Sequence, residues 1–185
     1  FHPVTTELEI IRHQAEELVD AILDSGLQYV VIYPNNDLGC EDIFNAYRRL
    51  EGHPRFRIFP SLRFEFFLTL LKNARFIIGN SSAGVREAPV YGLPCINVGT
   101  RQRDRFVHPC ILNTDGEKKA ISSAIRRVLA IGSFNGSLYF GRGESSTYFI
   151  EALRKDDLWA TPKQKHFYDI LINSGEKKAN EKTDR

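Results

Sequence analysis

The stretch FIIGNSSAGVRE (residues 76–87) decides the fold class that we predict for this chain. A run of large apolar residues ends at Gly79, small polar residues follow, and a helical pattern then begins. A strand that leads through a short loop into a helix is the repeating unit of a parallel sheet. Small side chains in such a loop let a ligand approach the backbone, and free N–H groups at a helix start attract phosphate.

The same alternation of strand and helix continues on both sides of this stretch. Expected strands are residues 28–33, 56–59, 75–79, 94–98 and 110–113, and expected helices cover 8–22, 41–51, 64–71, 83–91, 121–129 and most of 145–172. Thr6 and Glu9 have the spacing of a capping box at the first helix. Strands and helices joined by short connections predict an α/β protein with a doubly wound parallel sheet.

Composition excludes several classes of protein. The 185 residues carry 25 Lys and Arg against 23 Asp and Glu, a net charge of +2, which gives no support to nucleic-acid binding. No apolar run is long enough to span a membrane. Three cysteines with no paired spacing argue against a disulfide framework and indicate a reducing, cytoplasmic setting. The histidines share no short spacing, so no metal site is expected.

The ends of the chain suggest a piece of a longer polypeptide. The sequence contains no Met, and it opens on Phe1-His2-Pro3, which reads as the end of a strand entering a loop. Residues 174–185 are almost devoid of apolar side chains, so we expect a polar, disordered tail. The predicted domain therefore covers residues 1–173.

Ligands of doubly wound sheets bind outside the carboxyl ends of the strands. The loops that follow the expected strands are residues 2–6, 34–39, 60–63, 80–85 and 99–106. Candidate binding residues should lie in these loops.

The loop at 80–85 carries the strongest signal. The hydroxyls of Ser81 and Ser82 could bind phosphate, or they could only cap the helix, and the residues alone leave both open. Glu87, in the first turns of the helix, could accept hydrogen bonds from ribose hydroxyls or simply complement the helix dipole.

Polar residues of the other loops have similar alternatives. His2 could donate to a diphosphate or be a bystander, and Asn35 could bind a ligand or hold its own turn. The guanidinium groups of Arg101, Arg103 and Arg105 suit bidentate phosphate contacts, although at least one of them should simply be solvated.

Two long stretches, residues 76–89 and 92–105, resemble the UDP-N-acetylglucosamine 2-epimerase family, and residues 2–6 resemble the start of that family's second domain. Residues 140–143 are similar to its late glycine-rich turn, with Arg142 where an acidic residue is usual. The resemblance spans residues 1–155. Gly-Asn-Ser-Ser combined with Gly-Thr-Arg-Gln is closer to the hydrolysing branch, which serves sialic-acid-type sugar biosynthesis.

The resemblance implies a Rossmann-like doubly wound parallel sheet that forms the C-terminal half of a glycosyltransferase-B type fold. The partners it implies are a UDP-sugar, UDP, the missing N-terminal domain and a second copy in a homodimer. Carried over by position, the UDP-binding residues are His2 and Arg101 near the phosphates, Ser81 and Ser82 at the diphosphate, Glu87 at the ribose, Asn35 in the cleft and Leu62 at the uracil.

The implied reaction eliminates UDP and adds water, which gives N-acetylmannosamine. The key carboxylates belong to the absent half, so this chain receives no catalytic acid or base, requires no cofactor, and should be inactive alone. A glycosyltransferase of the same fold and a non-catalytic nucleotide-sugar-binding module are the alternatives. The sugar could equally be a diacetamido-trideoxyhexose.

Overall fold

A computed structural model describes residues 1–164 of the chain. These residues belong to two compact units, Phe1–Gly141 and a second unit that begins at Arg142. The domain boundary predicted at residue 173 and the predicted polar tail lie outside the described residues. Among residues 1–164, no helix is both long and apolar enough to cross a membrane.

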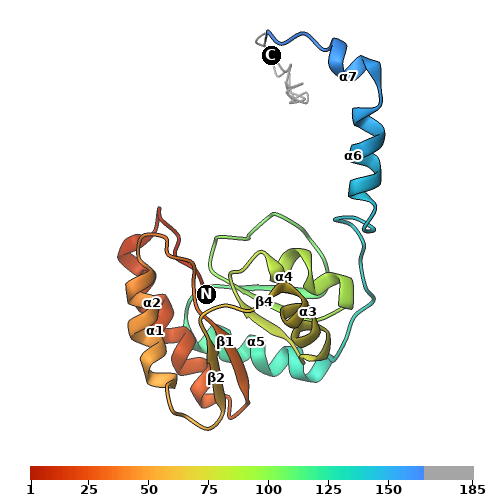
Figure 1. Cartoon of the computed structure of the whole chain (residues 1–185). Coiled ribbons are helices and arrows are strands. Elements are labelled where there is room, and N and C mark those ends of the chain that lie inside the picture. Colours follow the sequence, from red (N-terminus) through yellow and green to blue (C-terminus); the bar gives the residue numbers. More distant parts are fainter. Residues whose placement is uncertain (165–185) are drawn as a thin grey trace, which may run out of the picture. The chain divides into compact units, whose positions relative to one another are not determined.

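The first unit alternates helices and strands along the chain (Figure 1). Its elements are α1 (Leu8–Asp24), β1 (Tyr29–Ile32), α2 (Cys40–Tyr47), η1 (Arg48–Leu50), β2 (Phe56–Phe59), α3 (Phe64–Asn73), β3 (Ile77–Gly79), α4 (Ala83–Arg86), η2 (Ala88–Tyr91), β4 (Cys95–Val98), β5 (Ile111–Thr114) and α5 (Lys118–Ile131). The described part of the second unit contains α6 (Ser145–Leu153) and α7 (Asp156–Ala160). The α/β class predicted from the sequence is confirmed.

All strand pairs in the described chain are parallel, as predicted, but the strands form two sheets. One sheet pairs β1 with β2, and the other has the order β3-β4-β5. His2 lies between the two sheets, because it bonds both to Asn35, which follows β1, and to Asn80, which follows β3. Side-chain hydrogen bonds therefore connect the carboxyl ends of the two sheets.

The main core lies between the helices and the sheets. α1 packs against both α2 and α5, and α5 packs against β4 and β5. Among the most deeply buried core side chains are Ile11, Ala15, Val19, Ile43, Leu50, Ile96, Val98 and Ile121. Each large apolar side chain buried in this way contributes roughly 1.5–3 kcal/mol relative to its exposed state. This packing fixes the strand ends on which the candidate site is built.

The predicted capping box at the first helix does not form. Glu7 occupies the N-cap of α1 without a side-chain cap bond. Its carboxylate instead accepts a hydrogen bond from the Thr100 hydroxyl at 2.6 Å. This tertiary contact joins the start of α1 to the loop after β4.

The predicted helix over residues 83–91 is divided in two. α4 ends at Arg86, and a 3₁₀ turn with Pro89 at its start follows Glu87. Proline has no N–H to donate, and its ring opposes continuation of a regular helix. The predicted helix at 64–71 is present as α3, in which Phe64 is 59% exposed and Leu71 is the one buried side chain.

Two glycines allow close packing in this unit. A Cβ on Gly84 would lie 2.4 Å from Cys95 Sγ, so α4 sits directly on β4. Gly92 has a φ of +61°, and a Cβ there would lie 1.9 Å from the carbonyl oxygen of Phe134. The backbone N–H of Phe134 donates to the Gly92 carbonyl at 2.9 Å, which holds the two segments together.

Candidate functional site

Asn80 stands at the centre of the candidate site. It follows β3 directly and is 1% exposed. Its Oδ1 accepts the backbone N–H of His2 at 2.6 Å, and its Nδ2 donates to the His2 carbonyl at 2.8 Å. The side chain thus satisfies both backbone polar groups of His2 and fixes the first loop against the loop after β3.

The loop after β4 is attached to the same residue. The carbonyl oxygen of Asn80 accepts hydrogen bonds from Arg101 Nη1 at 3.0 Å and from Gln102 Nε2 at 3.1 Å. Gln102 is itself buried, and Arg105 donates to its Oε1 at 3.0 Å. These contacts place Arg101 beside Asn80, whereas Arg103 is exposed, as expected for at least one of the three arginines.

Hydrogen bonding and burial influence the state of the His2 imidazole. The backbone N–H of Asn35 points at Nδ1 at 3.2 Å, and Asn35 Oδ1 lies 3.2 Å from the same nitrogen. The two contacts belong to different tautomers: Nδ1 accepts from the backbone when the proton is on Nε2, and it donates to Oδ1 when the proton is on Nδ1. Burial, together with the positive charge of Arg101, lowers the pKa of His2, although Asn35 and Asp37 oppose the shift. His2 is therefore uncharged at physiological pH.

The two serines have different local roles. Ser81 Oγ accepts the backbone N–H of Ala83 at 3.3 Å, which is a local turn bond and not the predicted helix cap. Ser82 is the N-cap of α4, but its hydroxyl makes no cap bond. Within residues 1–164, the backbone N–H groups of Ser81 and Ser82 have no acceptor. Two amides and one hydroxyl are thus left to bind a ligand.

The two remaining predicted residues, Glu87 and Leu62, do not bond to this group. Glu87 is half-buried between α4 and η2, and its carboxylate has no hydrogen bond or ion pair with any described residue. Leu62 is half-buried in the loop between β2 and α3. A half-buried carboxylate without a partner is chemically suited to accept hydroxyl donors.

Sequence reasoning missed the central role of Asn80, the burial of Gln102 and an aromatic cluster. Phe106 stacks on Tyr139 with ring centroids 4.7 Å apart and meets Phe140 edge-on at 5.1 Å. The Arg86 guanidinium lies 5.7 Å from the centre of the Phe140 ring. The cluster connects the end of the 99–106 loop to the glycine-rich turn, and only the aromatic character of these positions could have indicated it.

The strand-end loops contain no group of three metal-ligating side chains among the described residues. One such group occurs in residues 1–164, and it consists of His13, Glu17 and Glu117. It belongs to α1 and to the residue that precedes α5, not to the site around Asn80.

Fold and site together define a Rossmann-like α/β protein whose polar loops meet at the carboxyl ends of parallel strands. The UDP-N-acetylglucosamine 2-epimerase family model matches residues 1–154. The chain therefore belongs to this family, and the resemblance described above is confirmed.

Individual relatives agree with this assignment. The chain is 43% identical over 175 residues to UDP-N-acetylglucosamine 2-epimerase of Neisseria meningitidis serogroup B. The aligned region covers 93% of this chain and 46% of that protein. It is 30% identical over 154 residues to the hydrolysing UDP-N,N'-diacetylbacillosamine 2-epimerase of Legionella pneumophila, covering 83% and 41% respectively. The chain thus spans less than half the length of these two relatives.

Among solved structures, the Methanocaldococcus jannaschii UDP-GlcNAc 2-epimerase in complex with UDP-GlcNAc and UDP is similar, with a TM-score of 0.64. Sequence identity is 18%, and the match covers 82% of this chain and 43% of that one. This likeness supports the Rossmann-like fold.

Proposed function

We propose that this chain holds the UDP moiety of a UDP-sugar as the C-terminal half of a hydrolysing UDP-N-acetylglucosamine 2-epimerase. The observation that carries the proposal is the group around Asn80, which gathers His2, Asn35, Ser81 and Arg101 at the carboxyl ends of β1, β3 and β4. The family match supports the class of ligand.

The diphosphate is bound by the hydrogen-bond donors of this group. The free amides of Ser81 and Ser82, the Ser82 hydroxyl, the Nε2–H of His2 and the Arg101 guanidinium supply hydrogen bonds. Most of these donors are neutral, so the empty site carries little charge repulsion. When the sugar–phosphate bond breaks, the same donors stabilise the charge that develops on the departing UDP.

The nucleoside is held by the remaining predicted residues. The partnerless carboxylate of Glu87 accepts the ribose hydroxyls, the backbone near Leu62 meets the uracil, and Asn35 lines the cleft. General acids and bases come from the absent half of the enzyme, so the chain alone has no epimerase activity. The whole enzyme works in the cytoplasm and forms a homodimer.

Product analysis tests the hydrolysing type. The full-length enzyme, incubated with UDP-N-acetylglucosamine and no acceptor, should release free N-acetylmannosamine and UDP in equal amounts. The Gly-Asn-Ser-Ser and Gly-Thr-Arg-Gln stretches and the hydrolysing Legionella relative support this choice. Accumulation of UDP-N-acetylmannosamine, or turnover that requires a sugar acceptor, would contradict it.

Replacement of Glu87 by Gln should weaken UDP binding about tenfold or more, because hydrogen bonds to a charged group contribute roughly 1.5–3 kcal/mol. Calorimetric titration of the full-length enzyme with UDP measures the change. The same titration with 2'-deoxy-UDP should show a smaller difference between wild type and variant, since one of the two ribose donors is gone. Glu51→Gln, an exposed change, is the control. Wild-type UDP affinity in Glu87→Gln would remove the ribose role.

The low pKa of His2 predicts a pH effect on the free protein. Because the folded-state pKa is below the usual value of 6.5, His2 favours folding fully above pH 6.5, and this contribution is lost as the pH falls through the lowered pKa. An NMR titration of the imidazole, assigned through His2→Asn, should show a midpoint well below 6.5. Adding UDP should raise the midpoint, since phosphate stabilises the imidazolium. A midpoint near 6.5 without UDP would contradict the burial of His2.

A further inference from the structure

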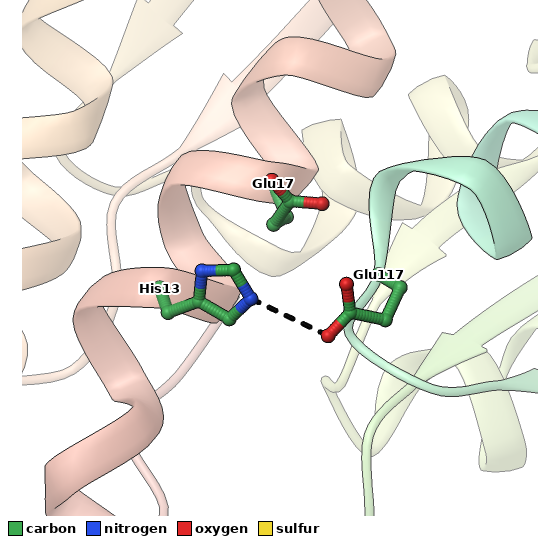
Figure 2. A group of neighbouring side chains, drawn as sticks. All are labelled: His13, Glu17 and Glu117. Carbon is green, nitrogen blue, oxygen red and sulfur yellow. Dashed lines mark hydrogen bonds and ion pairs between the residues drawn. The ribbon is translucent and has the colours of Figure 1, made fainter.

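Three metal-ligating side chains from distant parts of the sequence meet on the surface formed by α1 and the start of α5 (Figure 2). His13 and Glu17 lie four positions apart on α1 and therefore share one helix face. Glu117 precedes α5 directly. One ligand atom from each side chain lies within 4.8 Å of the other two, and His13 Nε2 is 3.3 Å from Glu117 Oε1.

The packing of the helices holds this arrangement in place. α1 packs along α5 in the main core, below the surface on which the three side chains lie. Glu17 Oε2 accepts the backbone N–H of Lys118, the first residue of α5, at 2.7 Å. That bond orients the Glu17 carboxylate and leaves its second oxygen available. His13 and Glu117 are more than half exposed, so their side chains can still adjust around an ion.

The group contains two carboxylates and one imidazole. Lys118 Nζ pairs with Asp24 at 2.7 Å and also interacts electrostatically with Glu17, whereas Arg12 lies 2.9 Å from Glu16 and Arg49 lies 2.6 Å from Asp20. His13 is the basic residue of the group, and it lies next to the carboxylate of Glu17 and the carboxylate of Glu117. Two carboxylates so close together favour a bound cation.

We propose that His13, Glu17 and Glu117 bind a divalent transition-metal ion of the Zn²⁺ type. One imidazole nitrogen with two carboxylate oxygens is a donor set that Zn²⁺ accepts in tetrahedral geometry, whereas Mg²⁺ and Ca²⁺ prefer oxygen alone. A tetrahedral ion needs its ligand atoms about 3.3 Å apart, which follows from bonds of about 2.0 Å. The 3.3 Å separation of His13 and Glu117 already meets this requirement. The ion would join α1 to α5 and stabilise the folded chain.

Thermal unfolding of the full-length protein tests the site with the metal alone as the probe. Micromolar ZnCl₂ should raise the melting temperature in a saturable manner, EDTA should reverse the rise, and MgCl₂ at the same concentration should have no effect. Calorimetry should show that His13→Gln, Glu17→Gln and Glu117→Gln each weaken Zn²⁺ binding at least tenfold. Glu117→Gln is the most informative variant, because the exposed glutamine keeps the size of the side chain.

Two controls separate this site from other Zn²⁺ binding. Glu16→Gln changes the neighbouring carboxylate on α1, outside the group, and should leave Zn²⁺ affinity unchanged. Cys40→Ser removes the one cysteine that is not buried and should also leave it unchanged. The proposal fails if Zn²⁺ does not raise the melting temperature, or if His13→Gln and Glu117→Gln bind Zn²⁺ like wild type. None of these results depends on UDP binding.

Discussion

Replacement of Asn80 by alanine is expected to remove UDP binding and to lower the free energy of unfolding by about 2–4 kcal/mol. The substitution deletes the two hydrogen bonds that pair the backbone N–H and carbonyl of His2, at 2.6 and 2.8 Å. The remaining groups are almost inaccessible to water, because Asn80 is 1% exposed. His2 then loses its position, and the loops that present Ser81 and Arg101 separate from it.

Urea denaturation and UDP calorimetry measure the two effects on the same variant. Asn73→Ala is the matched control, because Asn73 is an exposed asparagine whose side chain bonds only to the Thr69 carbonyl one helical turn earlier. Its stability should change by less than about 0.5 kcal/mol, and its UDP affinity should not change. Asn80→Ala with wild-type stability and affinity would show that the loops are held in another way.

Replacement of Gly92 by alanine is expected to destabilise the first unit by about 2–5 kcal/mol. Two costs add here: a positive φ costs an L residue roughly 1–2 kcal/mol, and overpacking costs roughly 1–3 kcal/mol. The new Cβ would lie 1.9 Å from a backbone carbonyl oxygen, that of Phe134, which cannot rotate away as a side chain could. The hydrogen bond from Phe134 to Gly92 ties the two segments together and prevents an easy shift.

Gly52→Ala measures the first cost alone. Gly52 has a similar φ of +70°, but a Cβ there would meet nothing within 4 Å. Its loss of stability should therefore be about 1–2 kcal/mol, the cost of the backbone conformation alone. Melting curves of both variants beside wild type give the difference. Equal losses in the two variants would mean that the Phe134 segment moves aside freely.

Local patterns predicted most of the fold. The strand at 56–59 has the predicted bounds, and the first predicted helix, which buries Ile11 and Leu18, is present. Both could be predicted because the spacing of apolar residues within a single element reflects which of its faces is buried. Two local signals were overridden. The capping box of Thr6 and Glu9 does not form, and Pro89 divides the predicted helix at 83–91. The pairing of strands into two sheets depends on distant contacts that no local pattern contains.

The candidate site was predictable in position but not in detail. The rule that ligands bind outside the carboxyl ends of parallel strands placed His2 and Arg101 on candidate loops. In the structure both residues bond to Asn80. The role of Asn80 could not be predicted, because its side chain bonds to a residue 78 positions away. The group of His13 and Glu117 escaped notice for the same reason, since 104 positions separate them and the expectation of no metal site rested on short spacings alone.

The contact between Gly84 and Cys95 has an evolutionary consequence. With only 2.4 Å from a prospective Cβ to the sulfur, neither position can change freely while the other stays fixed. A relative that acquires alanine at the first position needs a smaller residue than cysteine at the second, or a wider gap between α4 and β4. Across many homologues the two positions should therefore covary, although they lie eleven positions apart along the chain.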